Sequence, residues 1–410
     1  MYLGGISVFL FCFSFIMQGQ IEDYPLELKV PYFVDTSNNI LEYEKGNMNN
    51  LFDSINSFIL KGNGRINIVH FGGSHIQAAI YTEQFKKRLN NNFYGIIRSA
   101  GFVFPFKIAH TNSPVYYNST YSGKWSVCRN VKIRKNCTIG VGGISATTYD
   151  SAFSTTIFPQ KDNETFSFDK VTLMYSCSGS NYKAKINGKT IILDTTQNHI
   201  EVDFNNYKDT LYVKFYKTDS SINSKFTLYG FILDKKGGGI LYNVIGINGA
   251  STHSFLSCKL FKPQLSLLKP DLAIFSLGTN DAYGKKFNVS LYVSRLDSLI
   301  SWVREVNPEC KIIITVPNDD YYRRRYPNKN TLLQQKAIKN LASNQNIMVW
   351  DLLQIMGGYG SSLTWYRNGL MRYDRIHFTL KGYQLKGDLF FVAFMKSYAK
   401  YLKTHHHKEL

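Results

Sequence analysis

The stretch INIVHFGGSHIQAAIYTEQFKKRL, residues 66–89, decides the fold because its hydrophobic period changes in the middle. Its first part, 66–71, is mostly apolar and is typical of a buried β-strand. Its last part, 76–89, spaces apolar residues as an amphipathic helix does. Two glycines and Ser74 lie between the two parts. A buried strand followed at once by a helix indicates one unit of a parallel α/β sheet.

The same alternation returns in the second half of the chain. The sequence predicts strands at 271–277, 311–317 and 347–352, and helices at 291–306, 330–344 and 379–402. Strands that alternate with helices of this length predict a parallel sheet covered by helices on both faces. Ligand sites in such sheets lie beyond the carboxyl ends of the strands, and Ser74 directly follows its strand.

Between these two regions the pattern becomes that of antiparallel β-structure. Short segments such as 182–193 and 209–217 alternate apolar and polar residues and are separated by turn signals such as "NG". We therefore expect an all-β sandwich inserted into an α/β domain. The predicted division is a signal peptide at 1–19, the two parts of the α/β domain at 20–124 and 241–404, the inserted sandwich at 125–240, and a tail at 405–410.

The N-terminus predicts export. Residues 2–17 are almost wholly apolar, and Gly19 precedes Gln20, which resembles a secretory signal peptide cleaved near residue 19 or 20. No Lys or Arg precedes the apolar run, so a retained membrane anchor is the alternative. No later stretch of sequence is long and apolar enough to span a bilayer. We expect the mature protein in the periplasm, at the cell surface or in the medium.

Removal of the signal peptide would leave five cysteines, so at least one is unpaired within the chain. Cys128 and Cys137 are close enough in sequence to bridge across a hairpin. The absence of a C-x-x-C pair argues against a structural zinc site, and we expect no metal.

The formal net charge of +19 predicts attraction to polyanions. No nucleic-acid-binding motif accompanies the charge, so an acidic wall polymer or polysaccharide is the expected partner. The densest basic cluster, YYRRRY at 321–326, interleaves arginine with tyrosine. This segment is either a rim for a glycan or a solvated loop.

Three polar segments follow predicted strands or precede the last helix. Ser74 begins a helix, where backbone amides can stabilise an oxyanion, although a helix N-cap is the simpler interpretation. Asn280, in SLGTNDAYG, offers an amide donor at the same sheet edge or merely caps a turn. Asp374 and His377, in YDRIHF, are three residues apart, so the carboxylate can orient the imidazole. A capping Asp and a partly buried His are the alternative.

Taken together and in this order, the segments GGS, GINGAS, GTND and DRIH resemble those of the SGNH (GDSL-type) hydrolases. The resemblance implies a flavodoxin-like three-layer α/β fold and no cofactor. It further implies that Ser74 is the nucleophile, His377 the base and Asp374 the residue that orients it. The oxyanion hole would consist of the Ser74 amide, Gly249 and Asn280. Gly246 lies near Gly249 and is the alternative for its position.

One residue departs from the family pattern. The family usually has Asp where this chain has Gly73, and that Asp takes part in hydrogen bonds that brace the serine loop. The three residues of the triad are unaffected by the change.

The subclass is indicated by the insert and by His75, which directly follows the serine. Both features resemble the peptidoglycan O-acetylesterases and related polysaccharide acetylesterases, in which the sandwich is similar to a carbohydrate-binding module. We expect an exported serine esterase that removes O-acetyl groups from a polysaccharide, with peptidoglycan as one candidate. The alternatives are a non-catalytic glycan-binding protein on an esterase scaffold and a hydrolase of lipid or short-chain acyl esters.

Overall fold

The computed structural model describes residues 28–43, 48–61, 64–93, 99–132, 137–160, 166–219, 224–237, 239–284 and 286–405. The predicted signal peptide, residues 1–19, and positions 406–410 of the predicted tail lie outside these ranges. Within the described ranges, no helix has the length and apolar character needed to cross a membrane.

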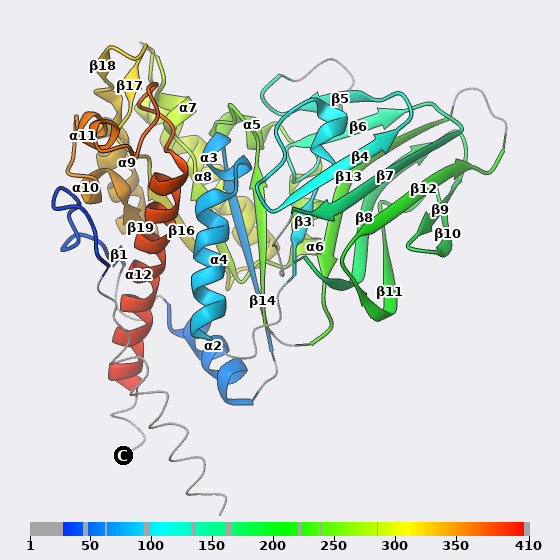
Figure 1. Ribbon diagram of the computed structural model, residues 1–410, viewed down its shortest axis with the longest axis horizontal. Helices are drawn as coiled ribbons and strands as arrows, with labels where there is room; N and C mark the ends of the chain where they lie inside the picture. Colours follow the sequence, from blue (N-terminus) through cyan, green and yellow to red (C-terminus); the bar gives the residue numbers. More distant parts are fainter. Residues whose placement is uncertain are drawn as a thin grey trace, which may run out of the picture.

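A six-stranded sheet forms the centre of the α/β domain (Figure 1). Its spatial order is β14 (Gly239–Gly246), β2 (Arg65–Gly72), β15 (Leu272–Ser276), β16 (Lys311–Val316), β19 (Met348–Asp351) and β1 (Leu41–Glu42). The first five strands are parallel, and β1 pairs with β19 in the antiparallel sense. Numbered along the chain, the parallel strands follow the order 2-1-3-4-5, which is the predicted flavodoxin-like order. The strand order reverses between β2 and β15, where such folds bind their ligands.

Helices cover both faces of this sheet, as the alternating pattern predicted (Figure 1). One face carries α2 (Asn49–Lys61), α4 (Ile80–Asn92) and α12 (Leu380–His405), and the other carries α6 (Phe261–Leu268), α8 (Val289–Val306) and α9 (Asn330–Gln345). Short helices lie in the loops, namely α3 (Ser74–Gln77), α5 (Thr252–Leu256), α7 (Thr279–Ala282), α10 (Leu352–Ile355) and α11 (Ser362–Arg367).

The helix predicted at 76–89 is in fact two helices. Ala79 adopts a left-handed conformation, with φ of +57°, and separates α3 from α4. The carbonyl of Ala78 turns away at this break and accepts the amide of Val115 at 3.2 Å. No Gly or Pro marks the break in the sequence. The contact with the distant segment around Val115 therefore overrides the helical pattern.

The antiparallel strands form a sandwich beside the parallel sheet (Figure 1). One sheet contains β10 (Lys189–Leu193), β9 (Tyr182–Ile186), β12 (Leu211–Lys217), β7 (Ala152–Pro159) and β4 (Tyr117–Ser122). The other contains β11 (His199–Lys208), β8 (Phe168–Ser178), β13 (Lys225–Asp234), β6 (Ile144–Thr148) and β5 (Ser126–Arg129), with β3 (Gly101–Val103) paired to β13. These strands begin at Gly101, ahead of the boundary predicted at 125, and end at Asp234. The early strands lack a clear signal because β3 has only three residues and β4, YNSTYS, is mostly polar.

Aromatic side chains fill the sandwich. The rings of Phe153 and Phe215 stack 4.9 Å apart, and both lie within about 5 Å of Phe226, at 5.2 and 4.8 Å. A polar link joins this unit to the parallel sheet, because the Phe102 amide donates to Asn243 Oδ1 on β14 at 2.9 Å. Asn243 also donates to the carbonyl of Ile68 on β2 at 3.3 Å. The sandwich and the α/β domain therefore share one continuous core.

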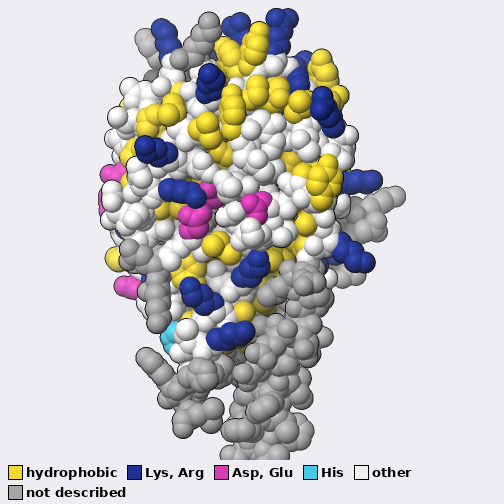
Figure 2. Space-filling view, turned by 90° about the vertical axis from the view of Figure 1, so that its left-hand side faces the viewer, with side chains coloured by type: hydrophobic (Ala, Val, Ile, Leu, Met, Phe, Trp, Pro, Cys, Tyr) yellow, Lys and Arg dark blue, Asp and Glu magenta, His cyan; other side chains and the backbone are white. Residues whose placement is uncertain are grey.

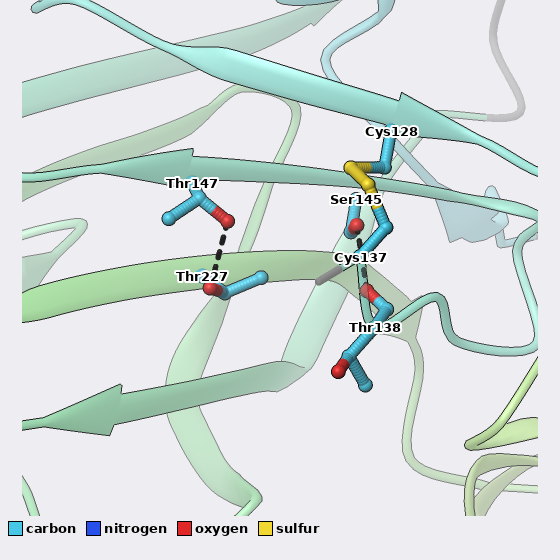
Figure 3. Close-up of a disulfide and its surroundings, with 6 residues drawn as sticks. All are labelled: Cys128, Cys137, Thr138, Ser145, Thr147 and Thr227. Atoms are coloured by element: carbon cyan, nitrogen blue, oxygen red, sulfur yellow. Dashed lines mark hydrogen bonds between the residues drawn. A yellow bond between two sulfur atoms is a disulfide. The ribbon is translucent and has the colours of Figure 1, made fainter. Parts of the chain in front are cut away.

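A disulfide joins Cys128 to Cys137, as their spacing allowed, with Cα atoms 6.1 Å apart (Figure 3). It holds the end of β5 beside the segment that leads to β6. In the same region, Ser145 Oγ donates to the Thr138 carbonyl at 2.8 Å. The other cysteines among the described residues are buried thiols, namely Cys177, Cys258 and Cys310.

The disulfide gives a first prediction. Replacing Cys128 and Cys137 together by serine should lower the free energy of unfolding by about 2–3 kcal/mol, because the bridge closes a short loop in the unfolded chain. Denaturant titration of the parent and the double variant measures the difference. A reducing agent should shift the midpoint of the parent and leave that of the variant in place. Equal midpoints without reductant would contradict a stabilising bridge.

Candidate active site

Ser74 is the first residue of α3 and lies just beyond the carboxyl end of β2. Gly73, which has no side chain to cap the helix, occupies the N-cap position. The Ser74 hydroxyl is 2.8 Å from Nε2 of His377, a residue three hundred and three positions later in the chain. The side chain of Ser74 is therefore directed at a histidine and does not cap the helix.

The loop before α12 holds Asp374 and His377 in one compact turn. Oδ2 of Asp374 is 2.8 Å from Nδ1 of His377, and its Oδ1 accepts the backbone amides of Ile376 and His377 at 2.9 Å each. Burial raises the pKa of Asp374, but the hydrogen bonds from the His377 side chain and from the two amides outweigh it, so the pKa lies well below its usual range. An ionised carboxylate fixes the imidazole with a proton on Nδ1, which leaves Nε2 to accept from Ser74.

Gly249 lies in the loop after β14, in a turn closed by a 2.9 Å bond from the Ala250 amide to the Ile247 carbonyl. Its φ of +85° favours glycine, and it lines the cavity in front of Ser74. The alternative, Gly246, has a different role. A Cβ there would lie 2.2 Å from the Gln77 backbone nitrogen, so Gly246 is needed where β14 packs against α3.

Asn280 lies in α7, after β15, and its Nδ2 donates to the carbonyl of Ala250 at 2.9 Å. A side-chain amide has two hydrogens, and Asn280 lines the cavity, so the second hydrogen is available to a bound ligand. The neighbouring Asp281 accepts both the amide and the hydroxyl of Thr252, the latter at 2.6 Å. The loop after β15, which carries Asn280, is thus joined to the loop that carries Gly249 through both Asn280 and Asp281.

Gly73, where the family usually has Asp, lies directly beneath the amide of Asn280. A Cβ at this position would be 2.9 Å from Asn280 Nδ2 and 3.3 Å from the Ala250 carbonyl oxygen. The amide therefore occupies the space that the first carbon of an Asp side chain would need. In this chain the serine loop is braced by the backbone, with the Ile247 amide donating to the Gly72 carbonyl at 3.1 Å.

These residues surround one cavity of about 810 Å³. All five predicted site residues line it, together with Gln77, Ala78, Ile80, Asn112, Ser113, Val115, Asn248, Thr279, Tyr283, Arg372, Ile376 and Tyr383. Within the ranges that the structure covers, no group of three His, Cys, Asp or Glu residues could hold a metal ion.

Gln77 is a structural member of the site that sequence reasoning did not identify. Its Nε2 donates to the Asn112 carbonyl at 2.7 Å, and its Oε1 accepts the Asn248 amide at 2.6 Å. One side chain therefore holds two walls of the cavity. Its position three residues after Ser74, on the same turn of helix, was the only signal available in the sequence.

A buried polar layer lies behind His377. The His75 ring stacks on the His377 ring, with centroids 5.1 Å apart and planes 30° apart, and its Nδ1 is 2.9 Å from the Tyr383 hydroxyl. Burial lowers the pKa of His75 well below its ordinary value, so this ring is neutral. Burial also lowers the pKa of Lys386 to about 7, and its ammonium lies 4.3 Å from the centre of the Tyr81 ring.

The fold and the three loops at its carboxyl edge resemble those of α/β ester hydrolases of the GDSL type. Residues 219–385 match the model of the GDSL-like Lipase/Acylhydrolase family, which confirms the predicted resemblance. This match supports a carboxylic ester hydrolase. No curated protein matches the sequence of the chain.

Solved structures share the architecture. The structure titled "Peptidoglycan O-acetylesterase in action, 5 min" is similar with a TM-score of 0.72 at 18% identity, covering 88% of this chain and 99% of the other. The likeness therefore includes both the parallel sheet and the sandwich. An acetyl xylan esterase is similar with a TM-score of 0.31, 16% identity, and coverage of 38% of this chain and 81% of the other. A family two carbohydrate esterase from Clostridium thermocellum has a TM-score of 0.30, 10% identity, and coverage of 69% and 100%.

The contact between Gly73 and Asn280 gives a second prediction. Gly73→Ala should lower kcat for 4-nitrophenyl acetate by at least about tenfold, approaching the loss typical of a missing oxyanion donor, because the new methyl group displaces the Asn280 amide. The control is the double variant with Asn280→Ala. Once the amide is gone, Gly73→Ala should cost little more, so the two losses should not add. Fully additive losses would mean that Gly73 acts independently of Asn280.

The burial of Lys386 gives a third prediction. The unfolded chain keeps a proton on this lysine up to about pH 10.4, whereas the folded chain keeps it only up to about pH 7. Between these values unfolding takes up a proton, so this group makes stability rise with pH. Relative to Lys386→Met, the free energy of unfolding of the parent should rise by up to about 1.4 kcal/mol per unit from pH 7 to 9.

Urea titrations at several pH values measure this slope. Lys381→Met, at an exposed position on the same helix, is the matched control and should keep the slope of the parent. Parallel curves for the parent and Lys386→Met would show that Lys386 keeps its proton in the folded state.

Proposed function

We propose that this protein is an exported serine esterase that removes O-acetyl groups from a polysaccharide. The observation that carries the proposal is the chain of two 2.8 Å contacts from Ser74 Oγ to His377 and from His377 to Asp374, at the wall of an open cavity. This arrangement can generate a serine nucleophile at neutral pH, because the histidine is held and oriented by an ionised carboxylate.

The proposed reaction has two stages. His377 Nε2 takes the proton of Ser74 as Oγ attacks the acetyl carbonyl, and the protonated His377 then gives that proton to the departing sugar oxygen. Water, activated by His377, attacks the acetyl-enzyme and releases acetate. The negative oxygen of each tetrahedral intermediate would accept from the amides of Ser74 and Gly249 and from Asn280 Nδ2.

Three features support a polysaccharide substrate and export. The fold, including the sandwich, is similar to that of a peptidoglycan O-acetylesterase, and peptidoglycan is therefore the first substrate to test. The cavity is open and holds both a cation and an aromatic ring, Arg372 and Tyr283, which suits a sugar polymer better than an acyl chain. The apolar N-terminus and the disulfide between Cys128 and Cys137 favour an oxidising compartment outside the cytosol.

The fourth prediction tests the nucleophile. The parent should release acetate from O-acetylated peptidoglycan, and Ser74→Ala should lower the rate by about a thousandfold or more while remaining folded. Asn280→Ala should lower turnover by about 100-fold, because one oxyanion donor is lost. Enzymatic assay of acetate gives the rates, and circular dichroism checks the fold.

A series of nitrophenyl esters distinguishes this function from its alternatives. Preference for acetate over octanoate supports deacetylation, whereas preference for octanoate would indicate a lipid esterase. Substantial turnover by Ser74→Ala would show that Ser74 is not the nucleophile. If the parent hydrolyses neither the esters nor any acetylated glycan, the binding-protein alternative replaces this proposal.

A further inference from the structure

The segment YYRRRY forms a short hairpin. β17 (Tyr321–Tyr322) pairs with β18 (Tyr326–Pro327), and three consecutive arginines make the turn between them. We call residues 321–327 the arginine hairpin. Arg323 and Arg324 have φ of +52° and +59°, a left-handed conformation that glycine or asparagine adopts at lower cost. Non-glycine residues in this conformation cluster at functional sites, which makes the hairpin a candidate for one.

The arginine hairpin is fixed to the wall of the candidate active site. The Arg323 amide donates to the Tyr283 hydroxyl at 3.1 Å, and the rings of Tyr283 and Tyr322 lie 5.4 Å apart. Tyr283 itself lines the cavity. On the other side, the Arg324 guanidinium lies 6.0 Å from the centre of the Tyr373 ring, and Tyr373 directly precedes Asp374. The hairpin therefore stands between the cavity wall and the loop that carries the triad histidine.

Arg375 supports the hairpin from below. Its guanidinium lies 4.3 Å from the centre of the Tyr321 ring and donates to the Arg324 carbonyl, and the Tyr321 amide donates to the Arg375 carbonyl at 3.2 Å. These contacts hold the turn in one orientation, so the three arginine side chains are presented at a defined place rather than on a free loop.

The outer surface of this region is cationic. Arg323, Arg324 and Arg325 are exposed, and so is Arg372, which lines the cavity. Within the described residues, no carboxylate forms an ion pair with any of these four side chains. Figure 2 shows Lys, Arg and hydrophobic side chains gathered at the upper end of this face, above the few acidic ones. That end corresponds to the position of β17 and β18 in Figure 1.

The acidic residues that immediately precede the arginine hairpin do not neutralise it. Asp319 and Asp320 immediately precede the hairpin, but both are buried. Burial raises the pKa of Asp320 to about 7, so much of this residue is uncharged at neutral pH. The positive charge of the three hairpin arginines therefore faces solvent beside the cavity.

Exposed tyrosines lie among these arginines. Tyr283, Tyr326 and Tyr373 have 40%, 64% and 65% of their surface exposed, so each presents part of its ring to solvent. A flat apolar ring with a polar tip packs against the C–H face of a sugar. The planar guanidinium forms paired hydrogen bonds with a carboxylate. A surface that combines the two matches a sugar polymer that carries carboxylates.

We infer that the arginine hairpin and Arg372 form a rim that binds the carboxylates of an acidic glycan and so guides its acetylated sugars to Ser74. This inference rests on the proposed function, because it names the class of polymer that the same site deacetylates. A carboxylated glycan is favoured over nucleic acid because the adjoining cavity is the candidate esterase site.

Binding to a catalytically silent protein tests the rim. The probe is polygalacturonate, with its fully methyl-esterified form as the neutral polymer of the same backbone. In the full chain carrying Ser74→Ala, the rim variant adds Arg323→Asn, Arg324→Asn and Arg325→Gln. Asparagine tolerates the left-handed conformation at the first two positions, so the turn is kept. The matched control adds Lys61→Gln, Lys87→Gln and Lys403→Gln, three exposed lysines on α2, α4 and α12, so that the same charge is removed away from both the rim and the sandwich.

We expect polygalacturonate to bind the parent more tightly than its ester does, and the rim variant to bind it about tenfold more weakly. Each exposed contact between an arginine and a carboxylate contributes only about two- to threefold, and three are removed. The control should bind as the parent does. The inference is overturned if the control loses as much affinity as the rim variant, or if the rim variant binds polygalacturonate as tightly as the parent does. It is also overturned if a single-stranded oligonucleotide binds the rim more tightly than polygalacturonate.

This measurement is independent of catalysis. A failure of the parent to release acetate from any polymer would remove the proposed function, whereas the affinities of the Ser74→Ala proteins would still decide whether the rim binds carboxylates. Conversely, the parent can be an active esterase while the rim variant shows no loss of affinity. That result would keep the proposed function and overturn the inference about the rim.

Discussion

The hydrogen bond from the Asn280 side chain to the Ala250 carbonyl, which passes over Gly73, is the contact on which the rest of the site depends. It joins the loops that follow β14 and β15 across the loop that follows β2 and lies between them. Gly72 is in register with Gly246 on one side and with Ser276 on the other, so all three loops leave the sheet at the same level. In this chain the Asn280 amide lies in the space that a Cβ at position 73 would need. The glycine before the serine therefore permits this placement of Asn280 beside Ser74.

Below these loops, two buried histidines are neutral. His70 is bonded on both nitrogens, to the Tyr242 hydroxyl at 2.6 Å and to the Ser276 hydroxyl at 2.7 Å, and burial lowers its pKa well below the ordinary value. His75 is neutral for the same reason. Asp374 differs, because three hydrogen bonds hold it in its charged form. A proton moving between Ser74 and His377 therefore responds to the fixed negative charge of Asp374 beside the neutral ring of His75, which suits a base that must gain and release a proton in each cycle.

The sequence was informative where a feature repeats with a regular period or follows a strand directly. Apolar runs located β2, β15, β16 and β19 to within about two residues. The five predicted site residues, which lie in loops beyond the sheet, surround one cavity. Local patterns could not reveal contacts between distant segments. The break at Ala79 and the role of Gln77 both depend on residues 111–115, which no periodicity links to the serine loop. Gly73 appeared as a departure from the family pattern until the position of Asn280 was known.

The sandwich contributes directly to the shape of the site. The segment between β3 and β4, two strands that both lie in antiparallel sheets, supplies Asn112, Ser113 and Val115 to the cavity wall. Backbone bonds to the Gln77 side chain and the Ala78 carbonyl fix this wall beside the serine. A rotation of the sandwich against the parallel sheet would therefore move one side of the cavity while the triad, built entirely on the α/β domain, stayed in place. The link from Phe102 to Asn243 opposes that rotation, because breaking it would leave a buried amide unpaired. The sandwich is thus held in a fixed position beside the active site, and both units together set the width of the cavity.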